Sequence, residues 1–210
     1  MMATEGIENF NQIVSALAGV AAVFVGAMGL TTWKNQIRWN RDHDLARRIL
    51  VDIFMYRDAF SAARSRWFPS SEMLDSGETA SFPDSDEISH QRTVRAHTRR
   101  VNRFQEIKSR IYSHTVEAEV LWGNDLGELW KNIVKLESEY IYQLERHLES
   151  SDPRNRSDRR GYYSDESERL KGNRIVFFDR SDEDYFDRKL SNEVSAISQY
   201  LREKIGETTP

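Results

Sequence analysis

The feature that most constrains this chain is an uncharged run of 25 residues, Asn9 to Trp33, near its N-terminus. As an α-helix the run would be roughly 37 Å long, enough to cross a hydrocarbon core of about 30 Å. The alternatives are a buried core helix and a cleaved signal peptide. Core helices seldom run this far without a charge, and two glutamates precede the run where a signal peptide would be basic. We therefore predict a short tail over residues 1–9 and a transmembrane helix over residues 10–33.

The charges on either side of the run predict its orientation. No Lys or Arg precedes it, whereas a basic cluster follows it: Lys34, Arg38, Arg41, Arg47 and Arg48. Positively charged residues flank spans on the cytoplasmic side. We therefore expect a single-pass protein of the cell inner (cytoplasmic) membrane, with its N-terminus outside and residues 34–210 in the cytoplasm. Trp33 and Trp39 suit the membrane interface, where an indole ring meets both lipid and water.

Small residues recur along one side of the predicted span, at Ser15, Ala18, Gly19, Ala22 and Gly26. Small residues four apart allow two membrane helices to approach closely, which favours their association. This pattern predicts a homo-oligomer that associates through the span. The alternative is that Ala and Gly are simply common in membrane helices.

The remaining residues predict an all-α domain. Apolar residues at helical spacing continue from the span toward Pro69, which cannot extend a helix. They are Leu45, Ile49, Ile53, Tyr56, Phe60, Ala63 and Trp67. A polar loop over residues 69–87 follows. A second helix is expected from about 87 to 121, with Val94, Val101, Phe104, Ile107 and Ile111 on its apolar face.

Two further helices complete the expected bundle. The first begins at the Gly123-Asn124 break, with Asn124 or Asp125 as its cap, and carries an apolar stripe from Leu126 to Leu148. A polar linker without apolar periodicity follows over residues 150–173. Residues 175–178 (IVFF) are expected to pack as an extended segment, because no second strand-like run exists to pair with them. The last helix has a buried face of Phe186, Leu190, Val194, Ile197, Leu201 and Ile205. Residues 34–210 therefore predict a cytoplasmic bundle of about four helices.

Charge is distributed in blocks that the net charge of −4 conceals. Residues 68–90 carry six acidic and no basic groups, whereas residues 91–110 carry seven basic groups and one acidic group. One helical stripe of the second block holds Arg92, Arg95, Arg99, Arg103 and Arg110. This stripe is either a face that binds anionic lipid or a partner, or the internal partner of the acidic loop before it and the acidic helix after it. Internal pairing is the favoured interpretation, because opposite blocks adjacent in sequence readily become adjacent in space.

No sequence motif for catalysis or cofactor binding stands out. The absence of Cys excludes disulfides, thiol catalysis and Cys-bound metals, and no phosphate-binding loop, nucleophile elbow or metalloprotease motif occurs. Arg92 and His97 have the Arg-x4-His spacing of helical ribonucleases of the HEPN type, in which an Arg and a His perform acid–base chemistry. In a chain this rich in Arg, such spacing arises readily by chance. We expect no enzyme activity, no cofactor, no metal and no nucleic-acid partner.

The order of features resembles a group of bacterial single-span membrane proteins that have a cytoplasmic helical domain and no assigned activity. The resemblance is carried by residues 33–36 (WKNQ), 45–48 (LARR), 57–59 (RDA), 184–186 (DYF) and 200–202 (YLR). It implies the architecture alone. The sequence thus predicts a membrane-anchored interaction or scaffold protein whose partners are the lipid bilayer, a second copy and an unidentified protein. The alternatives are a membrane-tethered HEPN-like ribonuclease that uses Arg92 and His97, and a soluble helical regulator with residues 9–33 buried in its core.

Overall fold

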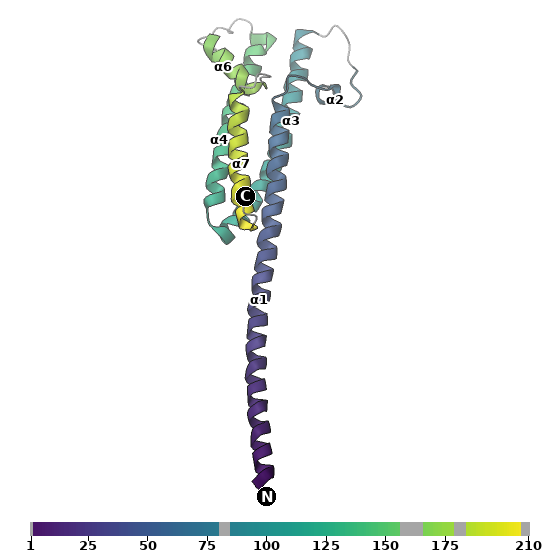
Figure 1. Ribbon diagram of the computed structural model, residues 1–210. Helices are drawn as coiled ribbons and strands as arrows, with labels where there is room; N and C mark the ends of the chain where they lie inside the picture. Colours follow the sequence, from purple (N-terminus) through teal and green to yellow (C-terminus); the bar gives the residue numbers. More distant parts are fainter. Residues whose placement is uncertain (1, 80–84, 156–165, 179–183, 207–210) are drawn as a thin grey trace. The chain divides into compact units, whose positions relative to one another are not determined.

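A computed structural model describes residues 2–79, 85–155, 166–178 and 184–206, with side chains from residue 25 onward except that of Ala27. Its order of elements is α1 (Met2–Ala63), α2 (Ser70–Met73), α3 (Asp86–Trp122), α4 (Asp125–Ser151), the 3₁₀ helix η1 (Pro153–Asn155), α6 (Glu166–Val176) and α7 (Tyr185–Lys204). These elements are all helical, as predicted (Figure 1). The chain divides into an N-terminal unit, residues 1–44, and a larger unit, residues 45–210.

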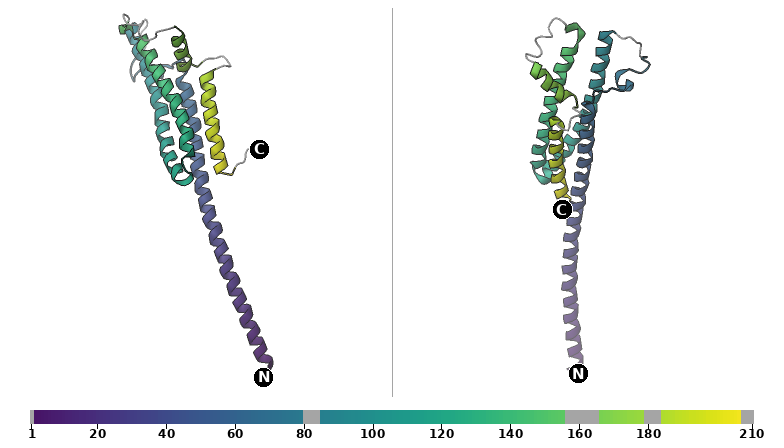
Figure 2. Two further views of the ribbon diagram at one scale, coloured as in Figure 1. Left: turned by 90° about the vertical axis from the view of Figure 1, so that its left-hand side faces the viewer. Right: turned by 45° about the horizontal axis from the view of Figure 1, so that its top comes forward.

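The larger unit is a four-helix bundle. Residues 45–63 of α1 lie beside α3, α4 and α7 in every view (Figures 1 and 2). Helices α1 and α3 run antiparallel, because ion pairs join Asp52 to Arg110 and Arg48 to Glu117. The turn between α3 and α4 is short, and Gly123 adopts the positive φ of 84° that a residue without a Cβ tolerates best. The bundle predicted from the apolar stripes is therefore confirmed.

The predicted apolar stripes form the core of this bundle. From α1 it contains Leu45, Ile49, Ile53, Tyr56, Phe60 and Ala63; from α3, Phe104, Ile107 and Ile111; from α4, Leu126, Trp130, Ile133, Leu136, Tyr140 and Leu144; from α7, Phe186, Leu190, Val194, Ile197 and Leu201. Aromatic rings pack around Phe60 in tilted contacts, with ring centres 5.2 Å away for Phe104 and 5.0 Å away for Tyr140. Packed rings of this kind add to the free energy that burial alone supplies.

Polar caps define where two of the helices start. The side chain of Ser85 accepts a hydrogen bond from the Ile88 amide at the start of α3. Asp184 accepts one from the Asp187 amide at the start of α7, where a carboxylate also meets the positive end of the helix dipole. Asn124 precedes α4, but its side chain donates to Glu128 instead of capping the backbone.

Four predictions for the larger unit are wrong. The first helix ends at Ala63, not at Pro69, so Trp67 lies beyond the helical spacing and is 72% exposed. A short helix, α2, occurs within the predicted 69–87 loop. Helix α6 occupies the second half of the predicted 150–173 linker and extends through Val176, so residues 175 and 176 are helical rather than extended. Residues 80–84 and 156–165 of these two segments lie outside the described part of the chain.

Tertiary contacts of Arg64 explain two of these differences. Its buried guanidinium donates hydrogen bonds to the carbonyls of Arg174 and Ile175 in the last turn of α6, each at 2.8 Å. Its own carbonyl accepts from the Phe178 amide at 2.8 Å. These bonds satisfy carbonyls that a helix end leaves without partners. They therefore stabilise α6 and hold the chain after Ala63 in a non-helical path.

Candidate functional site

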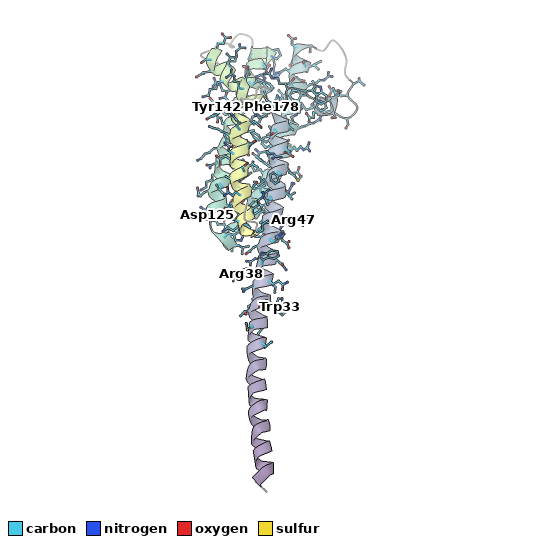
Figure 3. The ribbon with its side chains drawn as sticks, viewed as in Figure 1. Trp33, Arg38, Arg47, Asp125, Tyr142 and Phe178 are labelled. Carbon is cyan, nitrogen blue, oxygen red and sulfur yellow. The ribbon has the colours of Figure 1, made fainter. Side chains whose placement is uncertain are left out.

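An exposed apolar and basic surface lies on α1 in the N-terminal unit. Every described side chain from residue 28 to residue 41 is exposed, among them Leu30, Trp33, Ile37 and Trp39. Trp33 is 63% exposed, and Figure 3 shows it on α1 near Arg38. Lys34 and Arg38 lie among these apolar residues in the sequence. A contiguous group of large apolar side chains in water is unfavourable, and such groups mark surfaces that contact a membrane or a partner. We call residues 28–41 the collar.

Of the predicted span, residues 10–33, the side chains of residues 10–24 and of Ala27 lie outside the described residues. Searched over its described residues, the chain contains no helix with a stretch long and apolar enough to cross a bilayer. Of the predicted association stripe, Ser15, Ala18, Gly19 and Ala22 also lie outside the described side chains. Gly26 is described and exposed, and a Cβ added to it would meet no atom within 4 Å.

The N-terminal part of the arginine stripe pairs with the acidic loop. Arg92 and Arg95 both donate to the Glu78 carboxylate, at 2.9 and 2.7 Å. Arg99 pairs with Asp75 at 2.6 Å and donates to three backbone carbonyls of the same loop. The hydrogen bond from the Asp75 backbone lowers the pKa of Glu78 to about 2, together with the hydrogen bonds from Arg95 and Arg92. This loop contains the short helix α2, which the arginines hold against α3.

Of the two remaining arginines of the stripe, Arg110 pairs with α1 and Arg103 is exposed to solvent. Arg110 donates to Asp52 of α1 at 3.0 Å, with the His114 ring also near that carboxylate. Arg103 is exposed, and no ion pair with another described residue is recorded for it. The interpretation of all five arginines as one open face is therefore wrong for Arg92, which is buried. Internal pairing with the acidic loop accounts for Arg92, Arg95 and Arg99.

Arg92 and His97 are not arranged as an exposed acid–base pair. The Arg92 guanidinium is buried against Glu78. His97 is 1% exposed, and its ring meets the ring of Phe68 edge-on at 4.8 Å. Neither ring nitrogen of His97 has a hydrogen-bond partner among the described residues. Burial lowers the pKa of His97 to about 4, with smaller contributions from the nearby His147 and Arg100. A neutral imidazole enclosed in this way cannot reach a substrate bound at the surface.

A second, half-buried histidine, His147, lies near His97. The ring of His147 meets Phe177 edge-on at 4.9 Å, and Phe177 also contacts His97. Burial lowers the pKa of His147 and a hydrogen bond with Asn173 raises it, while Arg66 and His90 add smaller contributions that lower it. Both histidines are therefore neutral at pH 7 and pack as aromatic groups at the α6 end of the bundle.

A buried carboxylate in the centre of the bundle was not predicted. Glu137 of α4 accepts hydrogen bonds from Tyr56 of α1 and from Gln105 and Lys108 of α3, each at 2.6 Å. Burial and the adjacent carboxylate raise the pKa of Tyr56 well above its ordinary value. Three partners compensate the carboxylate, so Glu137 joins three helices rather than offering a reactive acid. Its place in an apolar helical stripe, between Leu136 and Tyr140, was the available sequence signal.

The buried arginines Arg64 and Arg100 were also missed, because their partners lie far away in sequence. Arg64 pairs with Asp184 at 3.0 Å across 120 residues. Arg100 pairs with Glu72 at 2.6 Å and lies 4.2 Å from the centre of the Phe68 ring, a cation–π contact. Both arginines hold the segment after α1 in place.

The described residues include no group of three or more His, Asp or Glu side chains that could hold a metal ion. Comparison of the chain with known protein families, curated proteins and solved structures finds no significant match. The function must therefore be argued from the surfaces of the molecule itself.

Proposed function

We propose that this chain is a membrane-anchored helical interaction protein that self-associates, with its N-terminus outside and its bundle in the cytoplasm. The observation that carries the proposal is the collar, because Trp33, Ile37 and Trp39 are exposed beside Lys34 and Arg38. Indole rings and basic side chains together suit the boundary between lipid and cytoplasm. The uncharged run 9–33 leads into this surface and overlaps it over residues 28–33.

Two features of the described residues weigh against the alternative functions. A helix buried in a soluble core would hide its apolar side chains, whereas Val25, Leu30 and Trp33 are exposed. A HEPN-like ribonuclease would need an accessible Arg92 and His97, whereas both side chains are buried. The bundle offers paired charges and packed rings, which suit a rigid interaction module.

Membrane fractionation of the full-length protein tests the anchor. We expect the wild-type protein to stay in the membrane fraction in alkaline carbonate and to be released by detergent. The double variant Val20→Arg with Val23→Arg is expected in the soluble fraction, because each Arg at the centre of a span costs about 2.5–3.5 kcal/mol of insertion free energy.

The matched control places the same two changes on α3, as Val116→Arg with Val120→Arg. Both valines are exposed in the bundle, so this variant is expected to remain in the membrane fraction. Release of the wild-type protein by carbonate without detergent would contradict the anchor. A reporter fused to the C-terminus tests the orientation independently, since only a cytoplasmic bundle leaves a cytoplasm-specific reporter active.

A further inference from the structure

A groove between α1 and α7 is the strongest unassigned feature of the bundle. The two helices run antiparallel, since Arg64, the residue that follows α1, pairs with Asp184 at the start of α7. Phe54 and Arg57, close to the C-terminal end of α1, therefore lie beside the middle and C-terminal half of α7. There the structure contains a cavity of about 330 Å³, lined by Phe54, Arg57, Ser191, Val194, Ser195, Ser198, Gln199 and Arg202.

The lining of this groove is rich in hydrogen-bond donors and contains no carboxylate. Two guanidinium groups, three hydroxyls and one amide contribute to it. The hydroxyl of Ser198 donates to the Val194 carbonyl of its own helix. Within the described chain, no hydrogen bond is recorded for the hydroxyls of Ser191 and Ser195. A groove with two cations and available hydroxyls favours an anion.

The two arginines come from different helices. Arg57 donates to Asp58 through Nε and Nη2, at 3.0 and 2.8 Å, and its guanidinium lies 5.3 Å from the centre of the Phe54 ring. A guanidinium has five N–H donors, so this pair leaves other donors of Arg57 for a ligand. Arg202 is exposed in the last turn of α7. Guanidinium groups with several donors recognise the oxygens of phosphate groups well.

We propose that this groove binds a phosphate group, carried by a small soluble ester or by a lipid headgroup. Arg57 and Arg202 contact the phosphate oxygens, and Ser191 and Ser195 donate further hydrogen bonds. The volume lies at the lower end of the range for small-molecule sites, about 300–1,000 Å³. It therefore has room for more than the phosphate, and Phe54 and Val194 provide apolar surface for the rest of the ligand.

Titration of the full-length protein in neutral detergent tests this proposal, with inorganic pyrophosphate as one probe and short-chain phosphatidic acid as the other. Isothermal titration calorimetry is expected to show binding of at least one probe. The separate variants Arg57→Gln and Arg202→Gln are expected to weaken that binding by about tenfold or more, the effect of losing one charge-assisted hydrogen bond. Arg188→Gln is the matched control, because Arg188 is exposed on α7 and does not line the groove.

The two probes separate the sources of the phosphate. Arginine-dependent binding of pyrophosphate supports a soluble phosphate ester, and arginine-dependent binding of phosphatidic acid alone supports a lipid headgroup. Binding of neither probe overturns the proposal. Equal loss of affinity in Arg188→Gln also overturns it, because the attraction would then be a general effect of charge. Unchanged far-UV circular dichroism of the variants ensures that a loss of binding does not reflect unfolding.

Discussion

Replacing Arg64 by Met removes the polar centre of the junction between α1, α6 and α7. Met retains much of the apolar stem but no donor. The change would leave the Asp184 carboxylate, 7% exposed in its side chain, without the guanidinium that lies 3.0 Å away. It would also deprive the carbonyls of Arg174 and Ile175 of their side-chain donor. Breaking a buried ion pair on one side is strongly destabilising, because the remaining charge stays buried.

The expected cost is about 3–5 kcal/mol of unfolding free energy. Domains of this size have unfolding free energies of about 5–15 kcal/mol, so the variant is expected to lose a substantial part of its stability. With a urea dependence of about 2 kcal/mol per molar, the midpoint of unfolding falls by roughly 2 M. Urea unfolding of the full-length protein in neutral detergent, followed by tryptophan fluorescence, measures this shift, and the buried Trp130 reports on the bundle.

Arg48→Met is the matched control, because Arg48 lies in α1, the helix that directly precedes Arg64, and its pair with Glu117 is exposed, at 3.6 Å. Exposed pairs contribute about 0–1 kcal/mol, so this variant is expected to unfold close to the wild-type midpoint. The double variant Arg64→Met with Asp184→Asn is expected to cost less than the sum of the two single changes, by about 1–3 kcal/mol. An Arg64→Met cost below about 1 kcal/mol, or an equal cost in Arg48→Met, would refute the reasoning.

The remaining predictions concern pH and self-association. Burial lowers the pKa of His97 to about 4, so between pH 6.5 and pH 4 the unfolded chain binds a proton at this residue that the folded protein does not. The contribution of His97 to the unfolding free energy is therefore fully present above pH 6.5 and decreases toward pH 4, by an amount on the order of 3 kcal/mol. In the variant His97→Phe the urea midpoint of unfolding is expected to depend less on pH over this range. An unchanged pH dependence would contradict the assignment to His97. Gly26→Leu is expected to reduce the cross-linked dimer of the membrane-embedded protein, whereas Ala21→Leu, on another face of the helix, is expected to leave it unchanged. Equal dimer yields in both variants would exclude the small-residue stripe as the association face.

Three of the bundle helices could be predicted from the sequence because their signals are local. The apolar stripe from Leu126 to Leu148 repeats at helical spacing, and the break at Gly123 separates α3 from α4. The last helix begins after an aspartate, Asp184, that caps it. Periodicity and capping depend on residues within a few positions of one another, so they can be recognised in the sequence without knowledge of the fold.

Helix α6 could not be predicted in this way. Its sequence contains Gly172 and Asn173, which are poor helix formers, and only Ile175 and Val176 form an apolar pair at its end. The helix depends instead on the bonds that Arg64 makes to its last carbonyls. The same bonds of Arg64 hold the chain after Ala63 out of the helical path. Helical spacing alone therefore placed Trp67 on the buried face of α1, whereas Trp67 is exposed.

The candidate sites show the same division. The opposite charges of residues 68–90 and 91–110 indicated a pairing of adjacent blocks, and Arg92, Arg95 and Arg99 do pair with that loop. No local signal linked Arg110 to Asp52, or Arg57 to Arg202, because the members of each set meet only when α3 and α7 pack against α1. The groove forms only where two helices pack together, so it could not be predicted from the sequence of either helix alone.

By itself, the sequence determined the helical nature of this protein, the faces that its main helices bury and the uncharged run before the bundle. Helix periodicity and charge are properties of neighbouring residues, so they persist whatever the chain packs against. The tertiary structure alone decided where α1 ends, that α6 forms, and which charges Arg64 and Glu137 compensate. Those outcomes depend on burial, since a carboxylate or guanidinium removed from water must find its partner wherever the fold brings one.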